Sequence, residues 1–250
     1  MAEVSFADRV VLVTGAAQGI GHAIAAAFHA AGARVHVADR DAAGLAAAPG
    51  VPHVADLADR AAAHALIAEI AAADGRLDIL ALAAGGVAGQ VGRPIEEVDE
   101  ASWHAIQAAN VEAALWLAQA ATPHMKHAGH GRIITISSGA GLRPSLTGIQ
   151  AYAAAKHALV GLTRQLSFEL GPHGITVNSV APGFIPSNPA SRRQWESYGP
   201  EGQAALLRSI HMRRLGTPED IAHAVLFLAC LLYTSPSPRD RTRSRMPSSA

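Results

Sequence analysis

Short runs of β-branched and other apolar residues alternate with alanine-rich helical segments along most of this 250-residue chain. We expect strands at residues 9–14, 35–38, 52–55, 77–83, 132–137 and 175–180, and helices at 20–31, 60–73, 101–127, 152–170 and from 218 onward. Short apolar strands joined by long helical crossovers are typical of parallel pairing, and a parallel sheet buries both of its faces under helices. The alternation therefore predicts an α/β fold, a doubly wound parallel sheet in a single domain.

Composition narrows the kinds of protein that this chain can be. Half of the residues are hydrophobic, enough for a sizeable core, and 20 basic residues balance 20 acidic ones. That balance gives no electrostatic reason to expect nucleic acid or an anionic membrane as a partner. Cys230 is the single cysteine, which excludes an intrachain disulfide and suits a reducing compartment. With no secretory signal pattern and no apolar run near ~18 residues, we expect a cytoplasmic protein.

A glycine-rich turn lies between the first expected strand and the first expected helix. Residues 14–21 read TGAAQGIG. Glycine lets the backbone turn tightly and approach a pyrophosphate, which the N-terminus of the following helix then stabilises. We expect dinucleotide contacts from Gly15, Gln18, Gly19, Ile20 and Gly21.

Two acids follow the next two strands. Asp39 ends the second strand, where a carboxylate can accept hydrogen bonds from an adenosine ribose and repel a 2′-phosphate. This favours NAD over NADP, although Arg40 could accommodate a phosphate and Asp39 could be an ordinary turn residue. Asp56 ends the third strand and is expected either to bind the adenine amino group or to cap a helix before Leu57.

A tyrosine and a lysine four residues apart begin the helix expected at 152–170. This spacing puts Tyr152 and Lys156 on one helix face, and lysine occurs only twice in the chain. A tyrosine has a pKa near ~10, so we expect the ammonium to lower that pKa and make the hydroxyl an acid/base. Ser138, at the end of the fifth strand, is expected to hold the substrate oxygen, with Ser137 as the fallback.

These motifs, in this order, resemble the short-chain dehydrogenase/reductase family over residues 7 to 229. The resemblance implies a Rossmann-like fold and the roles just argued for Ser138, Tyr152 and Lys156. It adds Asn110 as a fourth catalytic residue, holding a water that relays protons to the lysine. It also implies cofactor contacts from Leu57, Ala84, Gly85, Pro182, Gly183, Ile185 and Ser187, and a second cofactor role for Tyr152 and Lys156.

The chain departs from the family pattern in three places. Residues 82–85 read LAAG where Asn-Asn-Ala-Gly is usual, which removes two polar side chains below the cofactor. The spacing from Ser138 to Tyr152 is one residue longer than the commonest form. The family's last strand, with its Val-Asp-Gly-Gly-like ending, is missing, and its loss would expose one edge of the sheet.

Domain boundaries follow the composition. Residues 1–229 are expected to form the catalytic domain, with a loop or helical flap at 184–209 that covers substrate. Residues 230–250 contain a Ser-, Pro- and Arg-rich run that we expect to be disordered. This tail resembles translated sequencing-adapter read-through from an assembled metagenomic gene, so we expect a non-native end on a truncated chain. The alternative is a natural disordered tail.

We expect an NAD-dependent oxidoreductase that interconverts a secondary alcohol and a ketone on a small-molecule substrate. The main alternative is a 3-oxoacyl-thioester reductase, and an alternative of another class is a non-catalytic dinucleotide-binding redox sensor. His124, His127 and His130 have a metal-like spacing, but cationic side chains at a helix end suit the helix dipole, so we expect no metal. Family resemblance predicts a homo-oligomer, a tetramer or dimer, when the chain is full length.

Overall fold

The computed structural model describes residues 5–145 and 147–230, and its described part contains one six-stranded parallel sheet. The strands are β1 (Val10–Thr14), β2 (Arg34–Asp39), β3 (Val51–Val54), β4 (Ile79–Leu82), β5 (Gly131–Ile136) and β6 (Ile175–Val180). Their spatial order is β3-β2-β1-β4-β5-β6, so the chain winds outward in both directions from β1. This arrangement confirms the doubly wound α/β fold predicted from the alternation of strands and helices.

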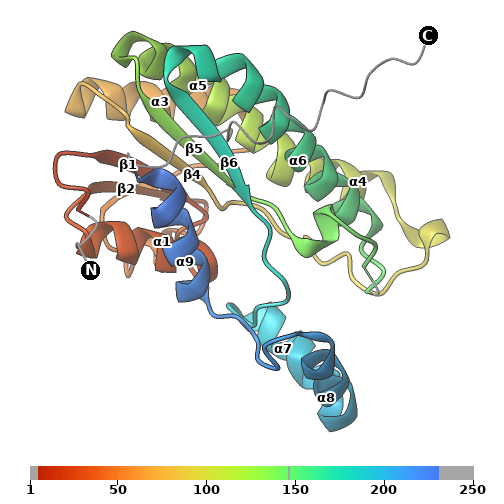
Figure 1. Ribbon diagram of the computed structural model, residues 1–250. Coiled ribbons are helices and arrows are strands. Elements are labelled where there is room, and N and C mark those ends of the chain that lie inside the picture. The colour runs from red at the N-terminus through yellow and green to blue at the C-terminus, as the bar shows by residue number, and fades with distance from the viewer. Residues whose placement is uncertain (1–4, 146, 231–250) are drawn as a thin grey trace, which may run out of the picture.

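Helices cover both faces of this sheet (Figure 1). Against one face lie α1 (Gly19–Ala30) and α9 (Pro218–Ala229), and against the other lie α3 (Arg60–Asp74), α5 (Ala113–Ala128) and α6 (Gln150–Leu170). A short helix, α2 (Ala42–Leu45), follows β2. Among the described helices, none is long and apolar enough to cross a membrane.

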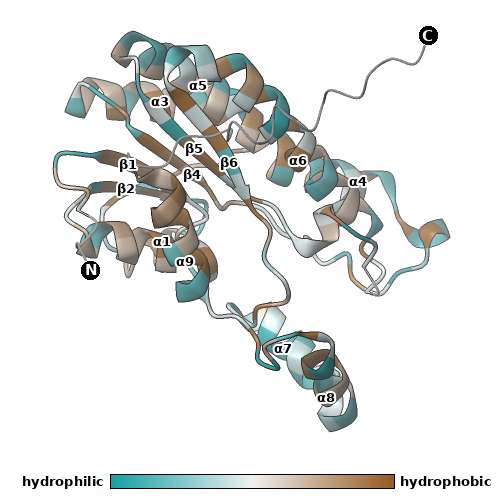
Figure 2. Cartoon of the chain, viewed as in Figure 1, coloured by the Kyte–Doolittle hydropathy of each residue, from teal (hydrophilic) through white to brown (hydrophobic). Residues whose placement is uncertain are grey.

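Alternate residues of the central strand supply two separate hydrophobic cores. Val11 and Val13 of β1 pack with Phe28 of α1, whereas Leu12 packs with Ile67 of α3 and Leu117 of α5. Because successive strand side chains point to opposite faces, a strand buried on both sides must be apolar throughout. Figure 2 shows this as hydrophobic colouring along the inner strands and on the inward faces of the helices.

The helix expected at 101–127 is interrupted. It consists of α4 (Glu100–Gln107), one π-helical turn at Ala108–Glu112, and α5. Asn110 lies inside this turn, and its side-chain nitrogen donates to the carbonyl oxygen of Ile106, four residues earlier, at 2.8 Å. A side chain that takes an i−4 carbonyl competes with the helical backbone, and single π turns are frequent at functional sites.

Residues 184–209, the region expected to be a flap, contain two helices that project from the body of the molecule (Figure 1). They are α7 (Pro189–Ser197), which Asn188 begins with a capping box, and α8 (Gly199–Ser209). Phe184 stacks on Trp195 with ring centroids 6.1 Å apart, and Tyr198 packs beside both rings. The aromatic cluster joins the base of the projection to its first helix.

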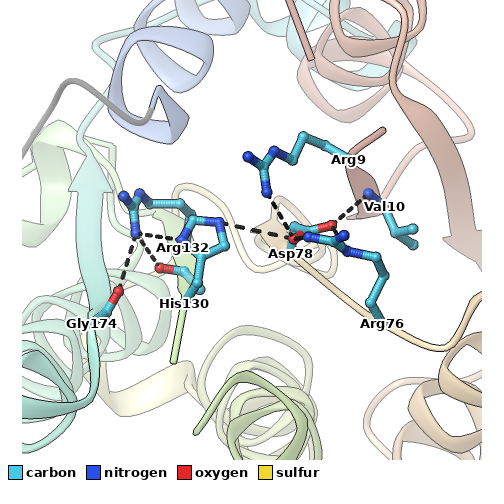
Figure 3. Close-up of polar contacts among 8 residues, drawn as sticks. Arg9, Val10, Arg76, Asp78, His130, Arg132 and Gly174 are labelled. Carbon is cyan, nitrogen blue, oxygen red and sulfur yellow. Dashed lines mark hydrogen bonds and ion pairs between the residues drawn. The ribbon is translucent and has the colours of Figure 1, made fainter. Parts of the chain in front are cut away.

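A buried carboxylate fastens the amino end of the sheet (Figure 3). Asp78 accepts hydrogen bonds from the backbone N–H of Val10 at 2.9 Å and from Arg76 Nε at 2.9 Å, and Arg9 Nη1 lies 3.4 Å away. Burial alone would raise the pKa of Asp78, but the Arg76 hydrogen bonds, the Val10 N–H and the charge of Arg9 lower it below its ordinary value. This contact ties β1 to β4 at the edge opposite the glycine-rich turn.

The outermost strands of the described sheet are β3 and β6. Of the tail expected at 230–250, the structure describes only Cys230, so the predictions about residues 231–250, and any strand formed there, lie outside the described residues.

Candidate active site

The glycine-rich turn between β1 and α1 has the geometry that a dinucleotide requires. Gly15 and Gly19 have φ of +66° and +59°, and a β-carbon at Gly21 would clash with the carbonyl oxygen of Gly15. Gln18 is the N-cap residue of α1, but its side chain makes no capping hydrogen bond. The first backbone N–H groups of α1, near Ile20, can therefore bind an anion such as pyrophosphate.

Asp39 lies beside this turn, at the carboxyl end of β2. Its two oxygens accept hydrogen bonds from the backbone N–H groups of Ala17 at 3.2 Å and Asp41 at 3.1 Å. These bonds fix the orientation of the carboxylate, and its remaining lone pairs can still accept ribose hydroxyls. Arg40 is exposed.

Asp56 is exposed, and its side chain accepts from the backbone N–H of Ala58 at 3.1 Å. It does not cap the following helix. Asp59 does so by accepting from the N–H of Ala61 at 2.8 Å, so the capping alternative for Asp56 was wrong. Leu57 is buried in the core beneath Asp56.

Residues 82–85 lack the two polar side chains usual in the family, but the backbone N–H groups after β4 are still hydrogen-bonded. Thr14 Oγ1 accepts from the backbone N–H groups of Ala83 and Ala84, both at 3.1 Å. Gly85 has φ of +133°, and a β-carbon there would clash with the side-chain oxygen of Asn110. Side chains from β1 and from the π-helical turn thus hold the backbone of this loop.

The polar atoms of Asn110 are bonded to this loop. Its Nδ2 donates to the carbonyl oxygens of Gly86 at 2.9 Å and Ile106 at 2.8 Å, and its Oδ1 accepts from the N–H of Gly86 at 3.1 Å. The residue is 1% exposed. In this structure its side chain joins the π-helical turn to the loop after β4.

Ser138 and Tyr152 come together at the carboxyl end of β5. Ser138 begins a short turn after β5, where its Oγ accepts from the N–H of Ala140 at 3.1 Å and lies near enough to the Tyr152 hydroxyl to lower the Tyr152 pKa. Ser137 is buried, and its hydroxyl donates to the carbonyl oxygen of Lys156 at 3.2 Å. The geometry therefore favours Ser138 over the fallback Ser137.

Lys156 is buried next to Tyr152. Its Nζ lies 5.4 Å from the centre of the Tyr152 ring and donates to the carbonyl oxygen of Ile136 at 2.8 Å. Burial lowers the pKa of Lys156 to about 8. The expected lowering of the Tyr152 pKa was wrong for this structure, because burial raises that pKa above its ordinary value and only the Ser138 hydrogen bond opposes the rise.

The segment after β6 closes the site from the side of α1. Pro182 accepts from the N–H of Gly139 at 2.7 Å, and Ile185 accepts from the N–H of Ser187 at 2.8 Å. A β-carbon on Gly19 would lie 3.1 Å from Ser187 Oγ, so this hydroxyl sits against the glycine-rich turn. Gly183 lies between these contacts and is exposed.

A cavity of about 330 Å³ opens between α1 and α9. Its lining includes Gly19 and Ser187, together with residues of α1 and α9, but not Tyr152. It therefore reaches the glycine-rich turn and Ser187, but not the proposed catalytic residues. The part of the chain that the structure describes holds no cluster of three or more His, Cys, Asp or Glu side chains placed to bind a metal.

Comparison with known proteins assigns the family. The family model described as "Enoyl-(Acyl carrier protein) reductase" matches residues 15–233, most of the chain. The chain belongs to the short-chain dehydrogenase/reductase family. This is a family of oxidoreductases, and the match confirms the resemblance carried by the glycine-rich turn and by Ser138, Tyr152 and Lys156.

This short-chain dehydrogenase/reductase aligns with curated relatives over most of its own length and of theirs. The (2S)-[(R)-hydroxy(phenyl)methyl]succinyl-CoA dehydrogenase subunit BbsD of Thauera aromatica is 36% identical over 231 residues, 89% of each chain. The 3-oxoacyl-[acyl-carrier-protein] reductase FabG of Escherichia coli is 34% identical over 232 residues, 90% of this chain and 91% of FabG.

Solved structures agree with the fold. The crystal structure of gox2181 superposes with a TM-score of 0.85 at 30% identity and covers 91% of both chains. An NAD+-bound xylitol dehydrogenase gives a TM-score of 0.82 at 25% identity, covering 90% of this chain and 93% of its own.

Proposed function

We propose that this short-chain dehydrogenase/reductase interconverts a secondary alcohol and a ketone with NAD(H), using Tyr152 as the acid/base. The observation that carries the proposal is that Ser138, Tyr152 and the buried Lys156 lie together at the carboxyl end of β5. Two hydroxyl groups at one point can hold a single carbonyl oxygen, one as a hydrogen-bond donor and the other as a proton donor.

The protein's part of the chemistry is proton transfer and charge stabilisation. In carbonyl reduction the Tyr152 hydroxyl gives its proton to the substrate oxygen, and the Ser138 hydroxyl stabilises the negative charge that develops there. The dinucleotide supplies the hydride in this direction and accepts it in alcohol oxidation. Lys156 would hold a ribose hydroxyl of the bound dinucleotide. Asn110 is proposed to support a proton relay to Lys156, and its side chain fixes the loop at Gly86.

NAD is the proposed cofactor, with NADP disfavoured. The fixed carboxylate of Asp39 supports this choice, because it can accept ribose hydroxyls and repels a 2′-phosphate. The steric fit of Gly15 and Gly21 and the uncapped start of α1 support a pyrophosphate at the glycine-rich turn. Further proposed contacts are Gln18, Gly19, Ile20, Asp56, Leu57, Ala84, Gly85, Tyr152, Lys156, Pro182, Gly183, Ile185 and Ser187.

Two alternatives concern the reaction itself. A 3-oxoacyl-thioester reductase is supported by the likeness to FabG and by the wording of the matching family model. A redox sensor would bind the dinucleotide without turnover. We further infer a cytoplasmic enzyme with a small-molecule substrate. When full length it would assemble as a homotetramer or dimer, with the tetramer built through the helical segment that holds Asn110 and through α6.

The decisive test is Tyr152→Phe, assayed by NADH absorbance against a panel of ketones, secondary alcohols and 3-oxoacyl thioesters. Losing the proton donor should lower kcat by roughly 10²–10⁴-fold. NADH affinity, measured by fluorescence titration, should stay unchanged because the ring remains in place. Tyr198→Phe, between α7 and α8, is the matched control and should keep the turnover of the unaltered chain. Full activity in Tyr152→Phe would contradict the mechanism. If the unaltered chain binds the cofactor but turns over no compound in the panel, the redox-sensor alternative is favoured.

A further inference from the structure

Two glutamines join the loop after β4 to the first turn of α6. Gln90 Nε2 donates to Gln150 Oε1 at 2.8 Å, and Gln150 Nε2 donates to the carbonyl oxygen of Arg93 at 2.8 Å. A backbone hydrogen bond from Gly92 to Thr147, 2.9 Å long, runs beside them. With the longer bond from Gln90 Nε2 to the carbonyl oxygen of Gly148, four hydrogen bonds connect segments that lie more than 50 residues apart in the sequence.

The hydrogen bonds fix the orientation of both amides. The carbonyl oxygen of Arg93 can only accept, so it must face the nitrogen of Gln150, whose oxygen then faces Gln90. Gln90 consequently presents its nitrogen, which also lies 3.4 Å from the carbonyl oxygen of Gly148. Its Oε1 is left without a partner although the residue is only 1% exposed. A buried polar atom without a partner is costly, which sets Gln90 apart from an ordinary surface contact.

This connection reaches the proposed catalytic residue. Gln150 is the first residue of α6 and stands two positions before Tyr152, while Ile149, the N-cap residue, has no side-chain capping bond. Gln107 of α4 adds a second contact from outside the helix, donating to the carbonyl oxygen of Ala151 at 3.3 Å. The start of α6 is thus held by side chains from other elements and not by a local cap.

We propose that Gln90 and Gln150 form a positioning pair that fixes the first turn of α6 and so aligns the Tyr152 hydroxyl with Ser138. The inference rests on the proposed function, since it concerns how Tyr152 is presented to the substrate. Small displacements of a reacting group lower rates strongly, because about 1 Å of misplacement can cost on the order of 10²-fold.

The test compares Gln90→Met and Gln150→Met with Gln119→Met, a matched change at an exposed glutamine on α5. In both test variants kcat should fall about tenfold, with NADH affinity and thermal midpoint close to those of the control. Ser138 lowers the pKa of Tyr152, so loss of alignment should move the pH limb of alcohol oxidation to higher pH. The double variant should lose less than the sum of the two single losses, because both changes break the Gln90–Gln150 hydrogen bond.

Hydrogen–deuterium exchange of residues 149–158 supplies a readout that needs no turnover. Backbone amides at the start of α6 should exchange faster in both test variants than in Gln119→Met. Unchanged exchange would overturn the connection itself, and faster exchange with unchanged kcat and pH limb would overturn its role in positioning Tyr152. If the unaltered chain shows no turnover, the proposed function fails together with this role in catalysis, while exchange still decides whether the glutamines hold the helix.

Discussion

Replacing Lys156 with Met should change stability in a pH-dependent way that can be calculated. Burial lowers the pKa of Lys156 from its ordinary value of 10.5 to about 8. Below pH 8 both the folded and the unfolded chain carry the proton, so the folded state bears the full cost of a buried charge. Between pH 8 and 10.5 only the unfolded state is protonated, so stability rises with pH. The difference between the two pKa values corresponds to roughly 3 kcal/mol.

Lys156→Met removes this titration while keeping most of the side-chain volume. The unfolding free energy of the unaltered chain minus that of the variant should therefore increase by about 3 kcal/mol between pH 7 and pH 10.5. Urea denaturation at half-unit pH steps measures both proteins, and subtraction removes the groups that titrate equally in each. A difference that stays flat across this range, or that falls with pH, would refute the buried, destabilised ammonium. Turnover in the variant should be lost.

Two further changes test the cofactor site and the amino end of the sheet. Asp39→Ala should narrow the preference for NAD over NADP in kcat/KM by about tenfold, since one favourable contact is lost. An unchanged ratio would rule out Asp39 as the selector, and Arg40→Ala measures separately whether the arginine accommodates a 2′-phosphate. Asp78→Asn should lower the unfolding free energy at pH 7 by about 1–2 kcal/mol, because the charge-assisted hydrogen bonds from Arg76 and from the Val10 N–H are weakened while Arg76 remains half-exposed to solvent. The folded-state pKa of Asp78 is lowered, so that difference should shrink as pH falls below about 4, and a pH-independent difference would contradict the assignment.

The fold could be predicted because its signals are local. The strand expected at 175–180 is β6, residue for residue, since its apolar run has clear boundaries. The strand before Ser138 ends one residue earlier than expected, at Ile136. Strand periodicity alone could not decide between Ser137 and Ser138, because neighbouring residues face opposite sides and a single position reverses their roles.

What could not be predicted depends on contacts between distant segments. The residues near Asn110 in the sequence do not predict a π-helical turn, because the residue that Asn110 binds there, Gly86, lies 24 residues earlier. Gln90 and Gln150, 60 residues apart, were missed for the same reason. The sequence also places Lys156 beside Tyr152 correctly but gives no measure of their burial, which decides the direction of both pKa shifts.

The order of the strands has a consequence for how the chain folds as it is synthesised. The first strand, β1, meets its second partner, β4, only after 68 more residues have been synthesised, the separation of Val10 and Asp78. At ordinary rates of translation this interval lasts roughly 3–14 s. During that time β1 can pair only with β2, and β2 with β3, on one side. The strands next to the proposed dinucleotide site therefore emerge from the ribosome, and can assemble, before Tyr152 has been synthesised.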